Sequence, residues 1–184
     1  IDKKFKKLKS EGRKAMIPFI TAGDPDLSFT VKLVLSLEKY GADIIELGIP
    51  YSDPIADGPI IQASSGRALK NGAKIIKIMN TVKEIRKNSE VPLVYLVYYN
   101  SIFKYGMEKF IKECNEVGID GLIIPDLPIE EKKEIEDIAD KYNVYLIPLV
   151  ASTSKERIKK IVENGKGFVY CVTIKGITGV RNEI

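Results

Sequence analysis

The chain has 184 residues, of which 45% are hydrophobic and 29% charged, and its net charge is +4. This balance is typical of a single globular domain, and because no run of about 18 apolar residues occurs we expect no transmembrane helix and no secretory signal. Histidine is absent, and the two cysteines, Cys114 and Cys171, fit no ligand spacing, so we expect a reducing cytoplasm, no disulfide framework and no metal site.

The first 13 residues are rich in lysine, which could indicate a nucleic-acid surface. However, Ile1, Phe5 and Leu8 recur at helical spacing, so we interpret the segment as an amphipathic helix with a solvated basic face. Elsewhere positive and negative charges alternate, which disfavours binding along a phosphate backbone. We therefore expect neither a nucleic-acid nor a membrane partner. Abundant Ile and Lys with a single Gln suits a thermophile.

Apolar runs without alternation then recur, which predicts strands buried on both faces of a parallel sheet. The runs are 15–21, 43–48, 92–98, 121–125, 144–150 and 167–173. Helical faces lie between them, one formed by Phe29, Leu33, Leu37 and Tyr40 and another by Phe103, Met107, Phe110, Cys114 and Val117. Repeated βα units of this length predict a doubly wound sheet or a (β/α)₈ barrel. No G-x-G-x-x-G or Walker A motif supports nucleotide binding.

In both folds the reactive residues lie at the carboxyl ends of the strands. Glu46 is a carboxylate inside the otherwise apolar second run, and no other strand interior supplies a cation to pair with it. Desolvation should therefore raise its pKa toward neutrality. We interpret Glu46 as a catalytic acid or base, the alternative being a structural ion pair.

The following loop contains three prolines and two more carboxylates, Asp53 and Asp57. Asp53 resembles a turn residue, whereas Asp57 could complete an acid–base pair with Glu46 and, in a polar loop, should stay ionised. Lys175 lies in a glycine-bounded segment after the sixth run, where a desolvated lysine could form a Schiff base. A solvated lysine on a lid is the alternative for that residue.

Five stretches resemble the alpha subunit of tryptophan synthase, in the order and spacing of that family. They are PFITAGDP at 18–25, GADIIELGIPYSDPIADGP at 41–59, YYN at 98–100, GIDGLIIPDLP at 118–128 and GFVYCVTIKGITG at 167–179. The resemblance implies a (β/α)₈ barrel that cleaves indole-3-glycerol phosphate to indole and glyceraldehyde 3-phosphate. It also implies a heterotetramer with a PLP-dependent beta subunit that receives the indole, and no cofactor in the alpha subunit itself.

Residue by residue, the resemblance implies that Glu46 and Asp57 are the catalytic carboxylates. The positions that resemble the substrate-binding site are Phe19, Ile61, Leu96, Ile123, Tyr170, Thr178 and Gly179. The positions that resemble the interface with the beta subunit are Pro50, Tyr51, Asp53, Pro54, Asn100 and Asp126. Within this pairing we expect Glu46 to move protons and Asp57 to accept the indole N–H.

Residues 1–184 are expected to form a single barrel domain that lacks the last two βα units of the family. Because those units would supply most of the phosphate site, we expect these residues alone to bind a phosphorylated substrate poorly. Two other functions remain open. One is a different phosphosugar aldolase that uses Lys175, and the other is a non-catalytic chain that only docks on and regulates a partner.

Overall fold

The computed structural model of the chain describes residues 1–127, 131–151, 157–163 and 165–172. Its strands are β1 (Phe19–Thr21), β2 (Ile45–Gly48), β3 (Leu93–Leu96), β4 (Gly121–Ile123), β5 (Tyr145–Leu146), β6 (Leu149–Ala151) and β7 (Tyr170–Val172). Within this described part, β1 to β5 form one parallel sheet in chain order, and β6 pairs in parallel with β7. Strand order that follows chain order is the order of a (β/α) barrel, as the sequence predicted.

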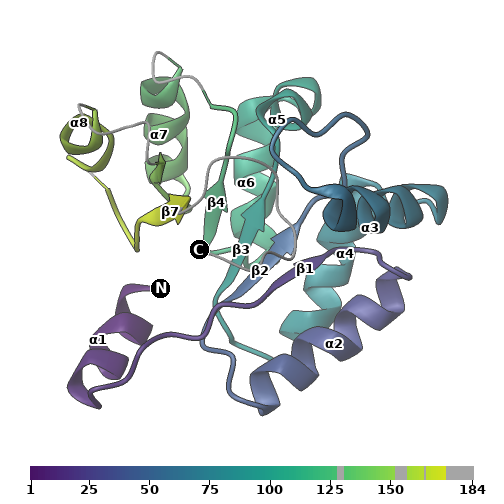
Figure 1. Cartoon of the computed structure of the whole chain (residues 1–184), viewed down its shortest axis with the longest axis horizontal. Coiled ribbons are helices and arrows are strands. Elements are labelled where there is room, and N and C mark those ends of the chain that lie inside the picture. Colours follow the sequence, from purple (N-terminus) through teal and green to yellow (C-terminus); the bar gives the residue numbers. More distant parts are fainter. Residues whose placement is uncertain (128–130, 152–156, 164, 173–184) are drawn as a thin grey trace.

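Helices connect the strands and cover one face of the sheet (Figure 1). They are α1 (Asp2–Ser10), α2 (Leu27–Lys39), α3 (Pro59–Lys70), α4 (Ile75–Arg86), α5 (Tyr99–Tyr105), α6 (Met107–Val117), α7 (Lys132–Lys141) and α8 (Ile158–Val162). The outer layer is continuous, because α2 contacts α4, α4 contacts α6 and α6 contacts α7. None of the helices in the described ranges is long and apolar enough to cross a membrane.

Alternate residues along the strands face two different hydrophobic clusters. Ile45 and Leu47 of β2 pack in the large cluster between the sheet and the helices. Ile44, one residue earlier, packs in a smaller cluster on the opposite face together with Val94 and Ile123. The second face is the barrel interior, and Glu46 points to it because side chains alternate along a strand.

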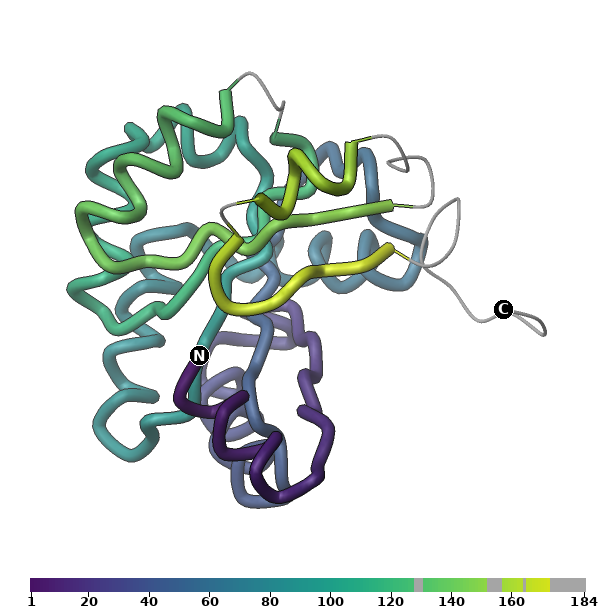
Figure 2. The backbone as a smooth tube through the Cα atoms, turned by 90° about the vertical axis from the view of Figure 1, so that its left-hand side faces the viewer, coloured from purple at the N-terminus to yellow at the C-terminus, as the bar shows by residue number. Residues whose placement is uncertain are grey.

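Helix α1 closes the amino-terminal end of this interior. Ile1 and Phe5 pack against the inner cluster, and the Phe5 ring lies 5.8 Å from the ring of Phe168. A Cβ on Gly121 would lie 3.3 Å from the Ile1 side chain, so β4 and α1 approach closely. Figure 2 shows α1, in purple, at the lower end of the view. The predicted amphipathic helix is confirmed, and the opposite end of the strands carries the candidate site.

The structure corrects the predicted strand over residues 144–150, which is two strands. Ile147 donates its N–H to Leu122 of β4 at 2.9 Å, whereas the carbonyl of Pro148 accepts from Tyr170 of β7 at 2.9 Å. Pro148 has no N–H to continue the first ladder, so the pairing changes partner there.

Two predicted helical faces are also corrected. Phe29 and Tyr40 are 42% and 83% exposed, and α2 instead buries Thr30 and Val34. The segment from Phe103 to Val117 is not one helix, because Gly106 adopts a φ of 95° between α5 and α6. This left-handed φ suits glycine and ends the first helix. Phe110, Cys114 and Val117 are nevertheless buried, as predicted.

Candidate active site

Glu46 lies in the middle of β2 and is only 5% exposed. Its register partners are Phe19 of β1 and Val94 of β3, whose side chains leave the sheet on the same face. One carboxylate oxygen, Oε1, has no hydrogen-bond partner among the described residues. Desolvation raises the pKa of Glu46 from about 4.5 to about 7. The predicted pKa shift is therefore confirmed, and near neutral pH the group can either give or take a proton.

Asp57 lies in the β2–α3 loop, two residues before α3 begins at Pro59. Its carbonyl accepts a hydrogen bond from Gln62 Nε2 at 2.8 Å, and its side chain accepts one from the hydroxyl of Tyr98. Desolvation is the larger effect and raises the pKa of Asp57, whereas the bond from Tyr98 lowers it. The sequence predicted a polar surrounding for this carboxyl, which is corrected, because the side chain is half-buried.

Tyr170 of β7 brings the two carboxyl groups into one neighbourhood. The pKa of Tyr170 is raised to about 12, chiefly by burial and also by the charges of Glu46 and Asp57. A phenol with this pKa stays protonated at neutral pH, so Tyr170 presents a neutral O–H and an aromatic face to the space near both carboxyl groups.

Apolar side chains surround Glu46 on the interior face. Leu96 and Ile123 are register partners at the carboxyl ends of β3 and β4, and both belong to the inner cluster with Tyr170. The Phe19 ring lies so close to Gly48 that a Cβ there would be 2.5 Å from Cζ. The structure thus places four predicted pocket residues around the interior. Ile61 lies apart from these strand ends in sequence, half-buried on the first turn of α3.

The predicted interface residues follow the strand ends at the rim. Asn100 Nδ2 donates to the Tyr51 hydroxyl at 2.8 Å, and Asp126 accepts from the Tyr99 N–H at 2.8 Å. Asp53 is exposed and Pro54 half-exposed, so both can meet a partner. Pro50 is buried and offers the least surface of the six predicted residues.

Three residues named from the sequence, Thr178, Gly179 and Lys175, lie outside the described residues. Sequence reasoning in turn missed Tyr98, which is 2% exposed and contacts both the loop and the Asp57 side chain. Its only sequence signal was its place in the YYN stretch at the end of the third strand. In the described ranges, no group of three or more Cys, Asp or Glu side chains is arranged to hold a metal ion.

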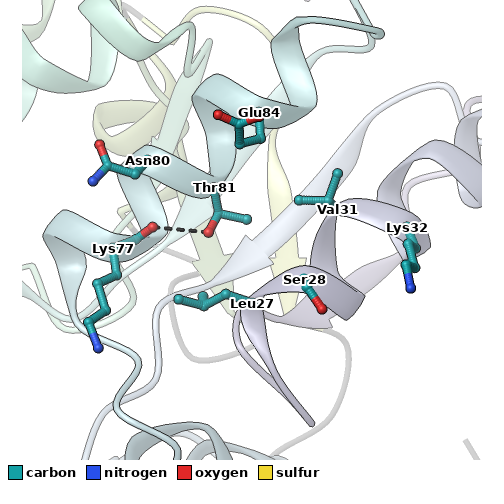
Figure 3. A pocket seen from close by; sticks show the side chains of 8 residues that line it. All are labelled: Leu27, Ser28, Val31, Lys32, Lys77, Asn80, Thr81 and Glu84. Carbon is teal, nitrogen blue, oxygen red and sulfur yellow. Dashed lines mark hydrogen bonds between the residues drawn. The ribbon is translucent and has the colours of Figure 1, made fainter.

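A hollow of about 570 Å³ lies on the outer surface, between α2 and α4 (Figure 3). Its wall includes Leu27 and Val31 of α2 and Lys77 and Thr81 of α4, whose Thr81 hydroxyl donates to the Lys77 carbonyl at 3.0 Å. None of these side chains comes from a strand end. The hollow therefore belongs to the helix layer and is separate from the site around Glu46.

Comparison with known proteins agrees with this geometry. The family model described as tryptophan synthase alpha chain matches residues 5–184. A tryptophan synthase alpha chain from Thermoanaerobacter sp. (strain X514) is 71% identical over the whole of this chain, which spans 70% of that relative.

Solved structures give the same result for the fold. The tryptophan synthase alpha chain from Legionella pneumophila has a TM-score of 0.88 and 40% identity, over 93% of this chain and 65% of that one. A structure of the tryptophan synthase a2b2 complex from the hyperthermophile Pyrococcus furiosus has a TM-score of 0.81 and 44% identity, over 85% of this chain and 64% of that one. The chain thus spans slightly less than two thirds of these solved relatives.

Proposed function

Because the chain belongs to the tryptophan synthase alpha chain family, we propose that it cleaves indole-3-glycerol phosphate to indole and glyceraldehyde 3-phosphate. The observation that carries the proposal is Glu46, a carboxyl group buried in the barrel interior with a pKa of about 7 and an oxygen that no described residue hydrogen-bonds. A buried, unpaired carboxyl costs stability, which is expected where the group serves chemistry.

Cleavage of the carbon–carbon bond requires two proton movements. One proton is delivered to C3 of the indole ring, and another is removed from the hydroxyl of the adjacent glycerol carbon, which becomes the aldehyde. The electron pair of the broken bond remains with the indole ring. Glu46 can perform both transfers in sequence, because a pKa near neutral pH keeps the protonated and ionised forms populated.

The second carboxyl group orients the indole. The indole N–H can only donate a hydrogen bond, so an ionised Asp57 is its acceptor in this proposal. Phe19, Leu96 and Ile123 supply an apolar wall at the same end of the barrel, and Tyr170 adds an aromatic face. Such a wall favours a flat aromatic ring and excludes water from the proton transfers.

We also propose that the rim around Tyr51, Asp53, Pro54 and Asn100 docks a beta subunit, because the structure of the Pyrococcus furiosus relative is that of a tryptophan synthase a2b2 complex. The prolines of the β2–α3 loop limit the conformational entropy that is lost on docking. PLP is then needed only in the beta subunit, and the chain works in the cytoplasm without a cofactor of its own.

Indole release tests this function directly. The chain is mixed with a beta subunit and with indole-3-glycerol phosphate in large excess, because weak substrate binding is expected, and indole and glyceraldehyde 3-phosphate are measured. A separate sample of the chain and substrate without the beta subunit receives borohydride, because borohydride would reduce the aldehyde product and the PLP imine. We expect equal amounts of both products and no covalent adduct on the chain. An adduct would support the aldolase that uses Lys175, and tight docking without any indole would support the regulatory alternative.

A further inference from the structure

Tyr98 lies between β3 and α5, at the carboxyl end of the strands, and is nearly inaccessible to solvent. Its hydroxyl oxygen accepts a hydrogen bond from the N–H of Ala56 at 3.1 Å, and its proton is donated to the side chain of Asp57. A phenol has one proton, so the bond from Ala56 leaves Asp57 as the acceptor of that proton. One hydroxyl thus binds two consecutive residues of the β2–α3 loop.

The ring of Tyr98 is itself held in place. It stacks on the ring of Tyr51 with centroids 4.9 Å apart and an angle of 25° between the planes. The Tyr51 hydroxyl in turn accepts the hydrogen bond from Asn100. A stacked and buried ring has little freedom to turn, so its hydroxyl stays aimed at the loop.

Charged groups around this contact favour a neutral Tyr98. Its pKa is raised to about 12, chiefly by burial and also by the carboxyl groups of Asp57 and Asp126, against the lowering effect of the Ala56 N–H. On the other side, Asp57 faces Tyr170, which also lies near Glu46. Among the described residues no cation adjusts the pKa of Asp57, so the Tyr98 hydroxyl is the group that opposes desolvation there.

We propose that Tyr98 is a positioning residue, which fixes the Asp57 carboxylate toward the substrate and stabilises its ionised form through a hydrogen bond. This inference rests on the proposed function for its catalytic consequence. The structural part of the inference, that the Tyr98 hydroxyl lowers the pKa of the Asp57 carboxyl, can be measured without any substrate.

Tyr98→Phe keeps the stacked ring and removes the hydroxyl, which deletes both the donor to Asp57 and the acceptor of the Ala56 N–H. The ionised form of Asp57 then loses its hydrogen bond, and its pKa rises by about one unit or more. A carboxyl with a raised pKa is ionised only at higher pH. The acid limb of the kcat–pH profile therefore moves to higher pH, and Glu46 contributes its own ionisation to the same profile.

The primary experiment is a ¹³C NMR titration of the aspartate carboxyl groups in the labelled chain, with Asp57→Asn used to assign the Asp57 resonance. Tyr105→Phe is the matched control, because Tyr105 also donates to a carboxylate, that of Glu113, but lies in the outer helix layer. We expect the Asp57 midpoint to rise in Tyr98→Phe and to stay unchanged in Tyr105→Phe.

The kinetic arm uses the same two variants in the complex with the beta subunit. We expect the acid limb of kcat to follow the NMR midpoint in Tyr98→Phe and to remain in place in Tyr105→Phe. An unchanged Asp57 midpoint in Tyr98→Phe overturns the proposal, as does a moved midpoint without any change in the acid limb. Absence of cleavage in the wild type would instead reject the proposed function, and the NMR titration would still decide whether Tyr98 controls Asp57.

Discussion

The ring of Phe19 occupies the space that a side chain on Gly48 would need. A Cβ on Gly48 would lie 2.5 Å from Cζ and 2.7 Å from Cε2 of that ring. Gly48 lies two residues after Glu46 on the same face of β2, and Phe19 is the register partner of Glu46. The absence of a side chain at position 48 therefore sets the position of the Phe19 ring relative to the Glu46 carboxyl group.

Gly48→Ala is expected to displace the Phe19 ring. Because the displaced atoms are the far end of a side chain, the unfolding free energy should fall by only about 1–3 kcal/mol. The wall would no longer fit the indole, so kcat/KM should fall by about tenfold to 10²-fold. Steady-state kinetics and urea unfolding measure both effects.

Gly66→Ala is the matched control for this substitution. A Cβ on Gly66, in the middle of α3, would meet nothing within 4 Å. Alanine in a helix should increase stability by up to about 1 kcal/mol and leave kcat/KM unchanged. Wild-type kcat/KM in Gly48→Ala would show that the Phe19 ring does not define the substrate wall.

The buried Glu46 should make the stability of the protein depend on pH. Its folded-state pKa of about 7 lies above the ordinary glutamate pKa of 4.5, so the wild type loses stability as pH rises from about 4.5 to about 7. Glu46→Gln removes this loss. The unfolding free energy of Glu46→Gln minus that of the wild type should therefore increase by roughly 3 kcal/mol from pH 4 to pH 8.

Urea unfolding at the two pH values measures this difference. Glu116→Gln serves as control, because Glu116 is exposed and pairs with Lys112 at 3.7 Å on the surface of α6. Its stability difference from the wild type should stay nearly constant with pH. If the difference in unfolding free energy between Glu46→Gln and the wild type were equally independent of pH, Glu46 would not be desolvated in the folded protein.

Charge reversal at the rim tests the proposed docking surface. Asp53 is exposed, and the side-chain contact in its loop is with the neighbouring Ser52, so Asp53→Lys should fold normally. We expect its dissociation constant for a beta subunit to increase by about tenfold or more, because the substitution reverses the charge and lengthens the side chain at the proposed interface. A titration by calorimetry gives the constant.

Glu116→Lys provides the control for Asp53→Lys. It makes the same change of charge on the last turn of α6, which leads to the amino-terminal end of β4 and so lies away from the rim. Its affinity for the beta subunit should equal that of the wild type. Equal affinities for Asp53→Lys and Glu116→Lys would remove Asp53 from the proposed interface.

Glu46 could be identified from the sequence because a lone carboxylate in an apolar strand has only a few physical explanations. Its burial and its pKa followed from that pattern. Tyr98 could not be identified in the same way, since its contact with Ala56 joins residues 42 positions apart. A hydrogen bond of this kind depends on how a loop folds back over a strand, which periodicity does not encode.

The helix faces show a different limit. Phe29 and Tyr40 have the hydrophobicity of core residues, yet α2 buries the smaller Thr30 and Val34. The Thr30 hydroxyl accepts the Gly23 N–H at 2.9 Å, a contact with the preceding loop that spacing does not encode. Hydrophobic spacing predicted the helix and, through Leu37, part of the face that packs against the core, but it placed Phe29 and Tyr40 there wrongly.

The central claim is that Glu46 moves the protons of the cleavage reaction, and kcat of Glu46→Gln in the complex with the beta subunit tests it most directly. Glutamine keeps the volume of the side chain and cannot exchange a proton at neutral pH. We predict that kcat for indole release falls by about 10² to 10⁴ or more while the protein remains folded. Glu46→Gln that retains more than about a tenth of the wild-type kcat would contradict the role of Glu46 as general acid and base.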